Sequence, residues 1–356
     1  MSVRLAASRS AFLTLALPGF LLALAGCAKE TPKEPEVPAY VPEVVAIPAP
    51  PPGFEPVPEP PDNPSTPEKA ALGRQLFFDK RLSVDRSRSC YSCHVNEHGL
   101  TDGLPVAVGA GEKKLTRSSP TLWNIGYHKE FYWDGRSPTM EKQAMAAWTG
   151  GNMGAKDHES EIVGKLNALP GYKAQFQKVF GTDVTADNMM KAITAYERTF
   201  FCGDTAFDKF QQGDQTALSD EAKRGWELFR TKAGCGTCHA GILLTDLQYH
   251  NVGAGMDAPE PDVGRKKVTN DEKDTGAFKT PTLRNITKTA PYFHNGSKAT
   301  LDEAVDFVLG GGYPNKYLDT KNLKKVKLTK KERDDLLAFL KSLECQGMLV
   351  EPKLPE

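Results

Sequence analysis

The sequence predicts a mainly α-helical fold of two related domains in tandem, connected by long loops. The first observation is that Cys-x-x-Cys-His occurs twice, at residues 90–94 and 235–239. The second is that apolar residues recur at helical spacing ahead of each motif, whereas the alternation typical of strands is scarce. We therefore expect one small helical domain around each motif.

Each motif has the spacing at which two thiols bond to the vinyl groups of a haem while the adjacent histidine ligates its iron. The thiols and imidazoles concerned are Cys90, Cys93 and His94 in the first domain and Cys235, Cys238 and His239 in the second. Zinc sites and redox pairs also use Cys-x-x-Cys, but the histidine directly after it favours haem in both cases. The sequence therefore predicts two tandem cytochrome c-type haem domains with two covalently bound haem c groups.

The helix ahead of the first motif is expected over residues 67–78, because its apolar residues are helically spaced and Thr66 offers an N-cap hydroxyl. Its counterpart ahead of the second motif is expected over residues 218–229. Thr139 and Thr300 are expected to cap the amphipathic segments that follow the two motifs.

The segments after the motifs also repeat. Pro120-Thr-Leu-Trp-Asn124 returns as Pro281-Thr-Leu-Arg-Asn285, and residues 131–136 are echoed by residues 291–297. Further helices are expected near residues 158–169, 186–201 and 329–344. The polar residues 211–215 divide a domain of residues 67–212 from one of residues 213–350.

The N-terminal 27 residues have the pattern of an export signal, with two arginines before an apolar run that is too short to span a membrane. The small residues before Cys27 predict a lipoprotein cleavage box with a lipidated Cys27; ordinary cleavage beside an incidental cysteine is the alternative. Residues 28–66, rich in Pro and Glu, predict a disordered tether. We expect a periplasmic protein held at the cell envelope, and specifically at the outer membrane, only through a lipid anchor.

Cys202 and Cys345 remain after the haem and lipid cysteines are assigned. In an oxidising compartment the two could pair, whereas two buried free thiols would leave the same sequence; we favour the disulfide. The formal net charge is zero, so nucleic acid is not an expected partner.

The two motifs, the Pro-Thr-Leu-x-Asn repeats, Trp133-Asp-Gly-Arg136 and Ala290-Pro-Tyr-Phe-His294 together resemble the bacterial dihaem cytochrome c peroxidases and the related MauG proteins. The resemblance covers residues 67–349. It implies that the first haem is the peroxidatic site, that the second receives electrons, and that Trp133 relays charge between them. It also implies that Gln143 lies in the distal pocket of the first haem.

Three positions depart from the family pattern. Ala110 stands where a distal His caps the first iron in some members, so we expect that iron to be five-coordinate or water-bound. Asn152 stands where the family has its catalytic Glu, and an amide cannot exchange protons at neutral pH, so acid–base help must come from His158, Glu159 or water. Val308 stands where the second haem has a Met or Tyr ligand.

Substitute ligands for the second iron are Met256, Tyr313 and Tyr317, although such residues in loops more often serve packing or lie at the surface. We expect His250 and His294 to brace the cofactor pocket rather than to ligate iron. His98 and His128 have no evident partner and are expected at the surface.

The family also implies a calcium ion between the domains. Its ligands would be the carbonyls of Thr289 and Pro291 and the side chain of Ser118, where the family has Asn. Serine is the weaker neutral oxygen ligand, so the resemblance supports calcium only in part.

Three functions follow from these residues. The leading one is a peroxidase that reduces hydrogen peroxide with electrons from a small cytochrome c or a cupredoxin. The second is a MauG-like enzyme that oxidises Trp or Tyr of a partner protein, and the third is a dihaem electron carrier without catalysis. Whether two chains pair, as in family members, stays open.

Overall fold

In the described part of this computed structural model, seven of the ten α-helices begin after a Thr or Ser whose side chain caps the first turn. The model describes residues 43–44 and 46–356. The predicted signal peptide, Cys27 and the first part of the tether lie outside this range. In the described part, no helix combines the length and apolar character that crossing a membrane requires.

Helices make up most of the regular secondary structure of the described chain, which confirms the mainly α class. The helices are α1 (Pro67–Phe78), α2 (Met140–Thr149), α3 (Glu159–Asn167), α4 (Pro170–Phe180), α5 (Ala186–Glu197), α6 (Ala206–Gln211), α7 (Asp220–Arg230), α8 (Lys266–Thr269), α9 (Leu301–Leu309) and α10 (Lys330–Lys341). Strands β1 (Tyr249–His250) and β2 (Phe278–Lys279) pair antiparallel, with Tyr249 opposite Lys279.

The predicted N-caps are confirmed. The side chains of Thr66, Thr139 and Thr300 accept hydrogen bonds from backbone N–H groups in the first turns of α1, α2 and α9. Three of the helices, α4, α6 and the short α8, were not expected. The sequence does carry signals for the first two, because α4 has Pro170 at its first position and α6 has a capping box of Thr205 and Asp208.

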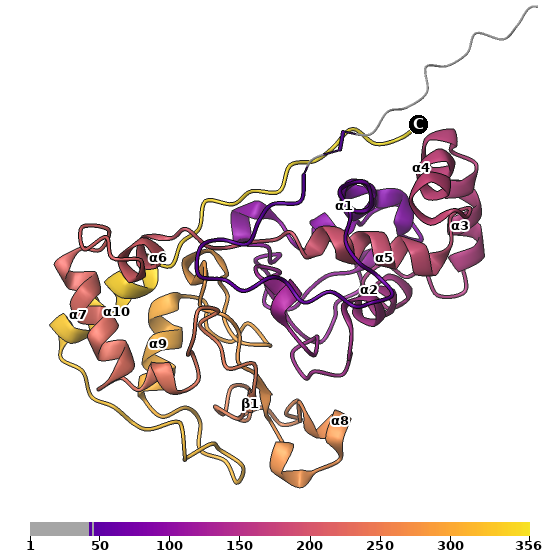
Figure 1. The fold of residues 1–356 in the computed structure, drawn as a ribbon. Helices are drawn as coiled ribbons and strands as arrows, with labels where there is room; N and C mark the ends of the chain where they lie inside the picture. The colour runs from indigo at the N-terminus through magenta and orange to yellow at the C-terminus, as the bar shows by residue number, and fades with distance from the viewer. Residues whose placement is uncertain (1–42, 45) are drawn as a thin grey trace, which may run out of the picture. The chain divides into compact units, whose positions relative to one another are not determined.

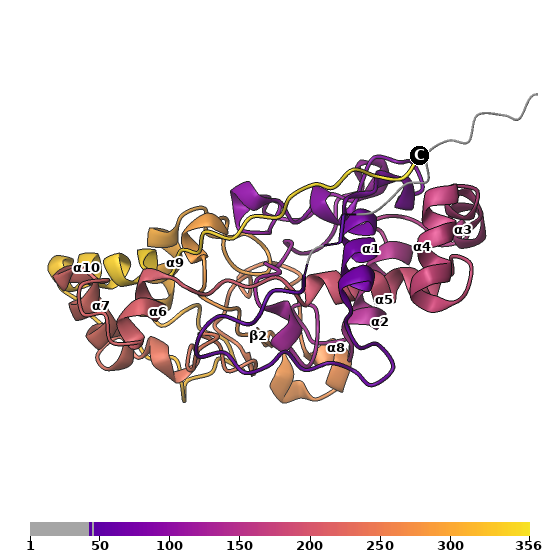
Figure 2. The same ribbon diagram turned by 45° about the horizontal axis from the view of Figure 1, so that its top comes forward.

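Each Cys-x-x-Cys-His motif contacts one helix of a crossed pair, α1 in the first domain and α7 in the second. α1 packs across α5, and α7 packs across α10 (Figures 1 and 2). The crossings depend on glycine, since a Cβ at Gly73 would lie 1.9 Å from the carbonyl oxygen of Ala192, and a Cβ at Gly225 equally close to that of Asp335. The sequence repeat is therefore a structural repeat.

The repeated asparagines occupy equivalent positions. Asn124 and Asn285 both adopt left-handed backbone conformations, with φ of 58° and 61°. The N–H of Asn124 donates to the carbonyl of Phe200, and that of Asn285 donates to the carbonyl of Leu343. Each acceptor precedes a cysteine by two residues, so Cys202 and Cys345 also occupy equivalent positions in the two domains.

The last part of the predicted tether differs from the expectation of disorder. Asn63 is fully buried, and its amide donates to the carboxylate of Glu141 at 2.8 Å and to the carbonyl of Lys191 at 3.0 Å. The ring of Phe54 lies 4.9 Å from the guanidinium of Arg284. Proline stiffens this segment, but the buried amide and the aromatic ring fix it to the folded domains, so the tether ends before residue 66.

The Cys202–Cys345 disulfide joins the two domains. The Cα atoms are 5.3 Å apart, and the cysteines are separated by 143 residues. Beyond Cys345 the chain returns to the first domain, where Asn96 exchanges two hydrogen bonds with the backbone of Leu349 and the guanidinium of Arg74 donates to the carbonyl of Val350. The predicted pairing is confirmed.

We expect the double variant Cys202→Ser, Cys345→Ser to lose roughly 3–5 kcal/mol of unfolding free energy, because the disulfide closes a long loop in the unfolded chain. Urea unfolding followed by circular dichroism measures this loss. Haem content should stay at the wild-type level, and wild type treated with dithiothreitol should match the variant. Unfolding curves that coincide with that of the oxidised wild type would contradict this expectation.

Candidate active site

The first cavity forms where the Cys90–Ser92 turn meets α2 and α5. Its lining includes both thiols of the motif and the imidazole of His94, facing Trp148 of α2 and Ile193 of α5. Nδ1 of His94 lies 2.9 Å from the carbonyl oxygen of Leu100. A carbonyl oxygen only accepts, so Nδ1 carries the proton and Nε2 keeps its lone pair.

The second cavity repeats this arrangement. It has a volume of about 230 Å³ and is lined by the thiols of Cys235 and Cys238 and by His239, below side chains of α7, α9 and α10. Nδ1 of His239 lies 3.1 Å from the carbonyl oxygen of Leu244. Both imidazoles thus offer Nε2 to a ligand.

The protonation of these groups suits haem binding. Burial lowers the pKa of His94 and of His239 below that of a free imidazole, so both rings are neutral and can ligate a metal. The four motif cysteines form no disulfide in the structure. The residues therefore fit two haem groups, each attached through two thiols and ligated by one imidazole.

A third cavity of about 630 Å³ lies between the two motif cavities. Its lining is rich in cations, namely Lys113, Lys114, Arg117, Arg136, Lys267 and Lys279. One carboxylate, that of Asp134, also lines it. Four of these cations are exposed at the rim, while Lys279 is buried and Arg117 half-buried, and the propionates of two haems would complement this excess of positive charge.

Trp133 connects the two domains. Although it belongs to the first domain, it lines both the second cavity and the cavity between the motifs. Its indole N–H donates to the carbonyl of Ser118 at 3.0 Å, and its own carbonyl accepts from the N–H of Lys279 at 2.8 Å. The first domain thus holds the ring and the second holds the backbone of Trp133, as a charge relay between the domains would need.

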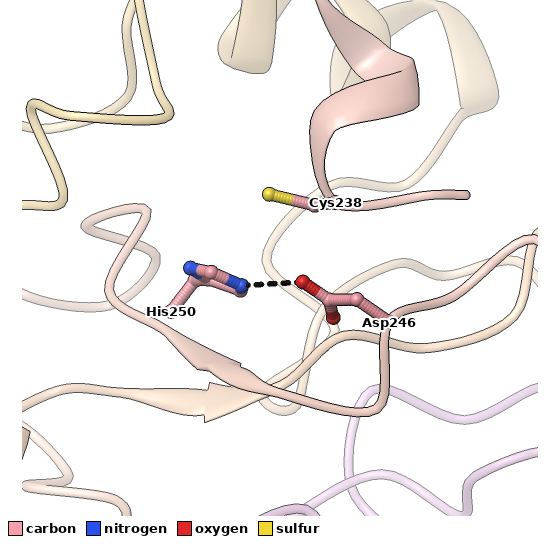
Figure 3. Close-up of side chains that lie close together, drawn as sticks. All are labelled: Cys238, Asp246 and His250. Carbon is pink, nitrogen blue, oxygen red and sulfur yellow. Dashed lines mark hydrogen bonds and ion pairs between the residues drawn. The ribbon is translucent and has the colours of Figure 1, made fainter.

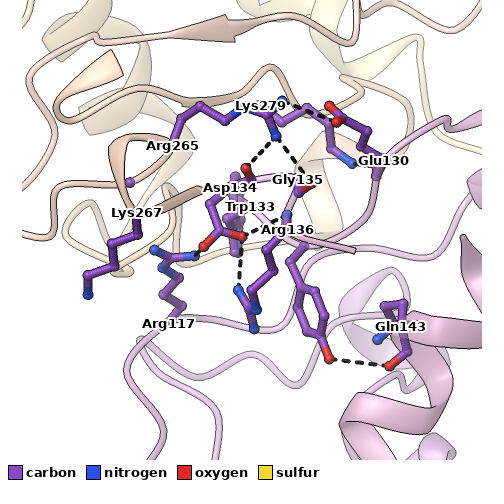
Figure 4. Close-up of polar contacts among 12 residues, drawn as sticks. Arg117, Glu130, Trp133, Asp134, Gly135, Arg136, Gln143, Arg265, Lys267 and Lys279 are labelled. Carbon is purple, nitrogen blue, oxygen red and sulfur yellow. Dashed lines mark hydrogen bonds and ion pairs between the residues drawn. The ribbon is translucent and has the colours of Figure 1, made fainter. Parts of the chain in front are cut away.

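A buried ion network surrounds Trp133 (Figure 4). The guanidinium of Arg117 lies 2.7 Å from a carboxylate oxygen of Asp134 and 2.7 Å from one of Asp262. Arg265 donates to the carbonyls of Asp134 and Gly135. Asp262 and Arg265 come from the second domain, so the network ties the segment 133–136 to both domains.

The comparisons with known proteins agree with this geometry. The family model described as di-haem cytochrome c peroxidase matches residues 67–216, and the model described as cytochrome c matches residues 222–344. Cytochrome-c peroxidase IdrP1 of Denitromonas iodatirespirans is 39% identical over 335 residues, which are 84% of this chain and 88% of that protein.

The methylamine utilization protein MauG of Methylorubrum extorquens AM1 is 37% identical over 310 residues, which are 85% of this chain and 85% of that protein. The chain belongs to the dihaem cytochrome c peroxidase and MauG family. A solved structure of a MauG-like protein associated with microbial copper homeostasis is 32% identical, with a TM-score of 0.75, and covers 88% of this chain and 98% of that one. The protein is thus a peroxidase-type oxidoreductase with haem c cofactors.

The family's distal-pocket positions lie where the first haem would bind. Gln143 and Asn152 both line the first cavity. Ala110 is buried, and its N–H donates to the carbonyl of Asn152 at 3.0 Å. A methyl group cannot ligate iron, so the position that carries a distal His in some family members offers no ligand here.

The expected acid–base substitutes are not brought to this cavity. His158 is exposed and pairs with Glu161, and neither His158 nor Glu159 lines the first cavity. The structure instead reveals Glu197, a residue that sequence reasoning missed. Its side chain lines the first cavity from α5, and it is 6% exposed. Met190, Ile193 and Glu197, at helical spacing on one face, were the available signal.

Burial raises the pKa of Glu197 to about 8. The positive charge of Arg198 opposes this shift, whereas the negative charge of Glu141 adds to it. The unfolded chain releases this proton near pH 4.5, so wild-type stability should fall between about pH 4.5 and 8. We expect Glu197→Gln to remove roughly 4–5 kcal/mol of this fall. Urea unfolding at pH 5 and pH 9 measures it. Glu161→Gln is the exposed control, and an unchanged slope for Glu197→Gln would contradict the assignment.

The second cavity offers no thioether or phenol at the family position. Val308 lines it, whereas Met256, Tyr313 and Tyr317 do not. Those three expected substitutes are thus not brought to the site. Tyr313 is 43% exposed, and the hydroxyl of Tyr317 donates to Glu272.

Two imidazoles line the second cavity instead, as expected for bracing residues. Nδ1 of His250 lies 2.6 Å from Asp319, and its Nε2 lies 2.9 Å from Asp246 (Figure 3). Hydrogen bonding to Cys238 and then to these two carboxylates raises the pKa of His250 to about 10. The ring of His294 stacks on Phe278 at 3.6 Å between centroids.

Potential ligand atoms of Cys238, Asp246 and His250 lie within 4.8 Å of one another. Because Cys238 is a haem-attachment thiol, we assign this cluster to the haem pocket rather than to a separate metal ion. Thioether formation would remove the Cys238 S–H group from the surroundings of His250, while both carboxylates would remain.

The two remaining histidines differ from each other. His98 is exposed, as expected. The surface position expected for His128 is wrong, because its Nδ1 lies 3.2 Å from the ammonium of Lys279 inside the cavity between the motifs. Burial and the positive charge of Lys279 lower the pKa of His128 well below its usual value. Its partner comes from the other domain, so no local pattern reveals it.

The calcium ligands implied by the family do not form a favourable donor set. Ser118, Thr289 and Pro291 line the same cavity, but the hydroxyl of Ser118 donates to the carbonyl of Phe293 at 3.0 Å. The cavity is dominated by cations, whereas calcium prefers several carboxylate and carbonyl oxygens. The residues therefore do not fit calcium.

Proposed function

We propose that this protein reduces hydrogen peroxide with electrons from a small periplasmic cytochrome c or a cupredoxin. The observation that carries the proposal is the placement of Trp133, which lines the space between two haem-binding cavities and is hydrogen-bonded to both domains. Electrons that enter at the second haem would need such a relay to reach peroxide at the first.

The bound haems would supply the iron that binds peroxide and the redox equivalents. The polypeptide supplies the surroundings. Gln143 offers an amide to the first cavity for hydrogen bonding, and Asn152 can orient a ligand but cannot exchange a proton. Glu197 is the carboxyl in this cavity that can hold and release a proton close to neutral pH.

The test is oxidation of a reduced small cytochrome c by peroxide, with protein that carries two haems. Rapid mixing with peroxide alone should change the haem spectrum. Trp133→Phe should keep both haem spectra and that direct reaction but oxidise the donor more slowly than wild type. Irons that stay six-coordinate and inert to both cyanide and peroxide would instead support the electron-carrier function.

A MauG-like activity on a partner protein is the second candidate. Ala110 and Val308 favour it, since neither offers the iron ligand of the gated peroxidases. Mass spectrometry of co-expressed neighbouring proteins, with and without peroxide, would reveal oxygen insertion or crosslinks on Trp or Tyr. If modification occurs while donor turnover is negligible, this second function replaces the first.

We further propose export to the periplasm and lipid anchoring at Cys27, specifically to the outer membrane. Cys27→Ser should release the protein from membrane fractions without changing its haem content.

Pairing of two copies is also proposed, and light scattering of the purified protein tests it. We do not include calcium among the proposed cofactors, because the donors around Ser118 are neutral and lie among cations.

A further inference from the structure

A lysine-rich surface borders the second cavity. Residues 313–331, which we call the lysine loop, contain seven exposed lysines and one carboxylate, Asp319. The lysines are Lys316, Lys321, Lys324, Lys325, Lys327, Lys330 and Lys331. The whole chain has 45 basic and 45 acidic residues, so this loop is a strong local excess of positive charge.

The carboxylate does not offset this charge at the surface. Asp319 faces inward, where it contacts His250 at 2.6 Å and accepts from the amide of Asn322 at 2.9 Å. Lys330 and Lys331 pair with Asp334 and Asp335 of α10. Among the described residues, Lys321, Lys324, Lys325 and Lys327 have no ion pair within 4 Å, so their charges remain available to a partner.

The loop is fixed to the wall of the second cavity. Asp319 and Lys324 line that cavity, together with Asn322 and Leu323. The N–H of Val326 donates to the carbonyl of Leu309 at 2.8 Å, and Val326 packs against the core of the second domain. The charges are therefore held beside the second haem site.

We propose that the lysine loop docks an acidic electron-donor protein next to the second haem. This inference rests on the proposed function and specifies its partner. Tyr313, 43% exposed at the start of the loop, provides an aromatic contact within a cationic rim, which is common at protein interfaces. An anionic membrane is a less suitable partner for the loop, because the second haem receives its electrons from a protein donor and not from a lipid surface.

The test is stopped-flow reduction of the oxidised protein, without peroxide, by an acidic cupredoxin and by a basic cytochrome c. The acidic donor should react faster at low salt, and its rate should fall as salt rises. The triple variant Lys324→Glu, Lys325→Glu, Lys327→Glu should slow the acidic donor by roughly 10- to 100-fold. The matched control Lys156→Glu, Lys173→Glu, Lys178→Glu changes the net charge equally in the first domain and should react like wild type.

Equal rates for the two donors at low salt, or equal losses in both triple variants, would overturn the proposal. Loop-dependent binding to phosphatidylglycerol vesicles with unchanged donor rates would overturn it in favour of a membrane contact. Haem spectra and circular dichroism establish that the variants are folded. Because peroxide is absent, failure of the peroxidase function would not affect this result, and failure of docking would leave peroxide reactivity intact.

Discussion

Replacing Cys90 and Cys93 with serine is expected to leave one covalent haem per chain and to abolish the reaction with peroxide. Both thiols and His94 line the first cavity, and a hydroxyl cannot form the thioether bonds that fix the haem there. Without the haem, the apolar wall formed by Trp148 and Ile193 is no longer covered, so this domain should also lose stability. Pyridine haemochrome analysis and intact-protein mass spectrometry give the stoichiometry.

The matched control is the double variant Cys235→Ser, Cys238→Ser. It should also retain one haem, yet that haem occupies the first site and should still react with peroxide, while oxidation of a protein donor should fail. The two variants therefore separate the roles of the cavities. If the first variant still carried two haems, or still reacted with peroxide, the assignment of the first cavity as the peroxide site would be wrong.

Replacing Arg117 with methionine is expected to lower the unfolding free energy by about 3–5 kcal/mol. The side chains of Arg117 and Asp134 are 11% and 4% exposed, and Arg117 also contacts Asp262 at 2.7 Å. Methionine fills similar space but removes the cation that both carboxylates share, which leaves Asp134 with the exposed Arg136 at 2.9 Å and Asp262 with Lys267 at 4.0 Å. Thermal and urea unfolding of the haem-bound protein measure the loss.

A surface arginine with the same type of contacts is the control. Arg333 bridges Asp302 and Asp306, whose side chains are 60% and 58% exposed. Arg333→Met should therefore cost less than about 1 kcal/mol. Adding Asp134→Asn and Asp262→Asn to Arg117→Met should recover stability, since the two carboxylates that lost the Arg117 cation are then neutral amides. If Arg117→Met and Arg333→Met lowered the unfolding free energy equally, the larger contribution assigned to the buried network would be wrong.

Much of the helical framework could be predicted because its signals are local. Thr66, Thr139 and Thr300 cap helices as expected, since a capping hydroxyl bonds to a backbone N–H only three residues ahead. The helix expected over residues 186–201 ends at Glu197, because the chain must then leave α5 to place Phe200 and Cys202 against Asn124. That contact spans the domain and leaves no periodic signal.

The site residues divide in the same way. Trp133 and Gln143, which were given by family position, line the cavities beside the motifs, and their roles stay predictions. Those whose roles depend on remote partners did not follow from the sequence. Glu197 reaches the first cavity from a helix a hundred residues past the motif, and His128 is enclosed by Lys279 of the other domain.

The sequence by itself determined two haem-attachment sites, the internal repeat and the helices that carry them. Covalent haem attachment depends on five consecutive residues and helix capping on four, so a short stretch of sequence is enough to predict either. Only the tertiary structure decided which buried carboxyl enters the first cavity, how Arg117 joins Asp134 to Asp262, and where the lysine loop lies. Those arrangements depend on packing between segments far apart in the chain, whose burial and charge no single segment specifies.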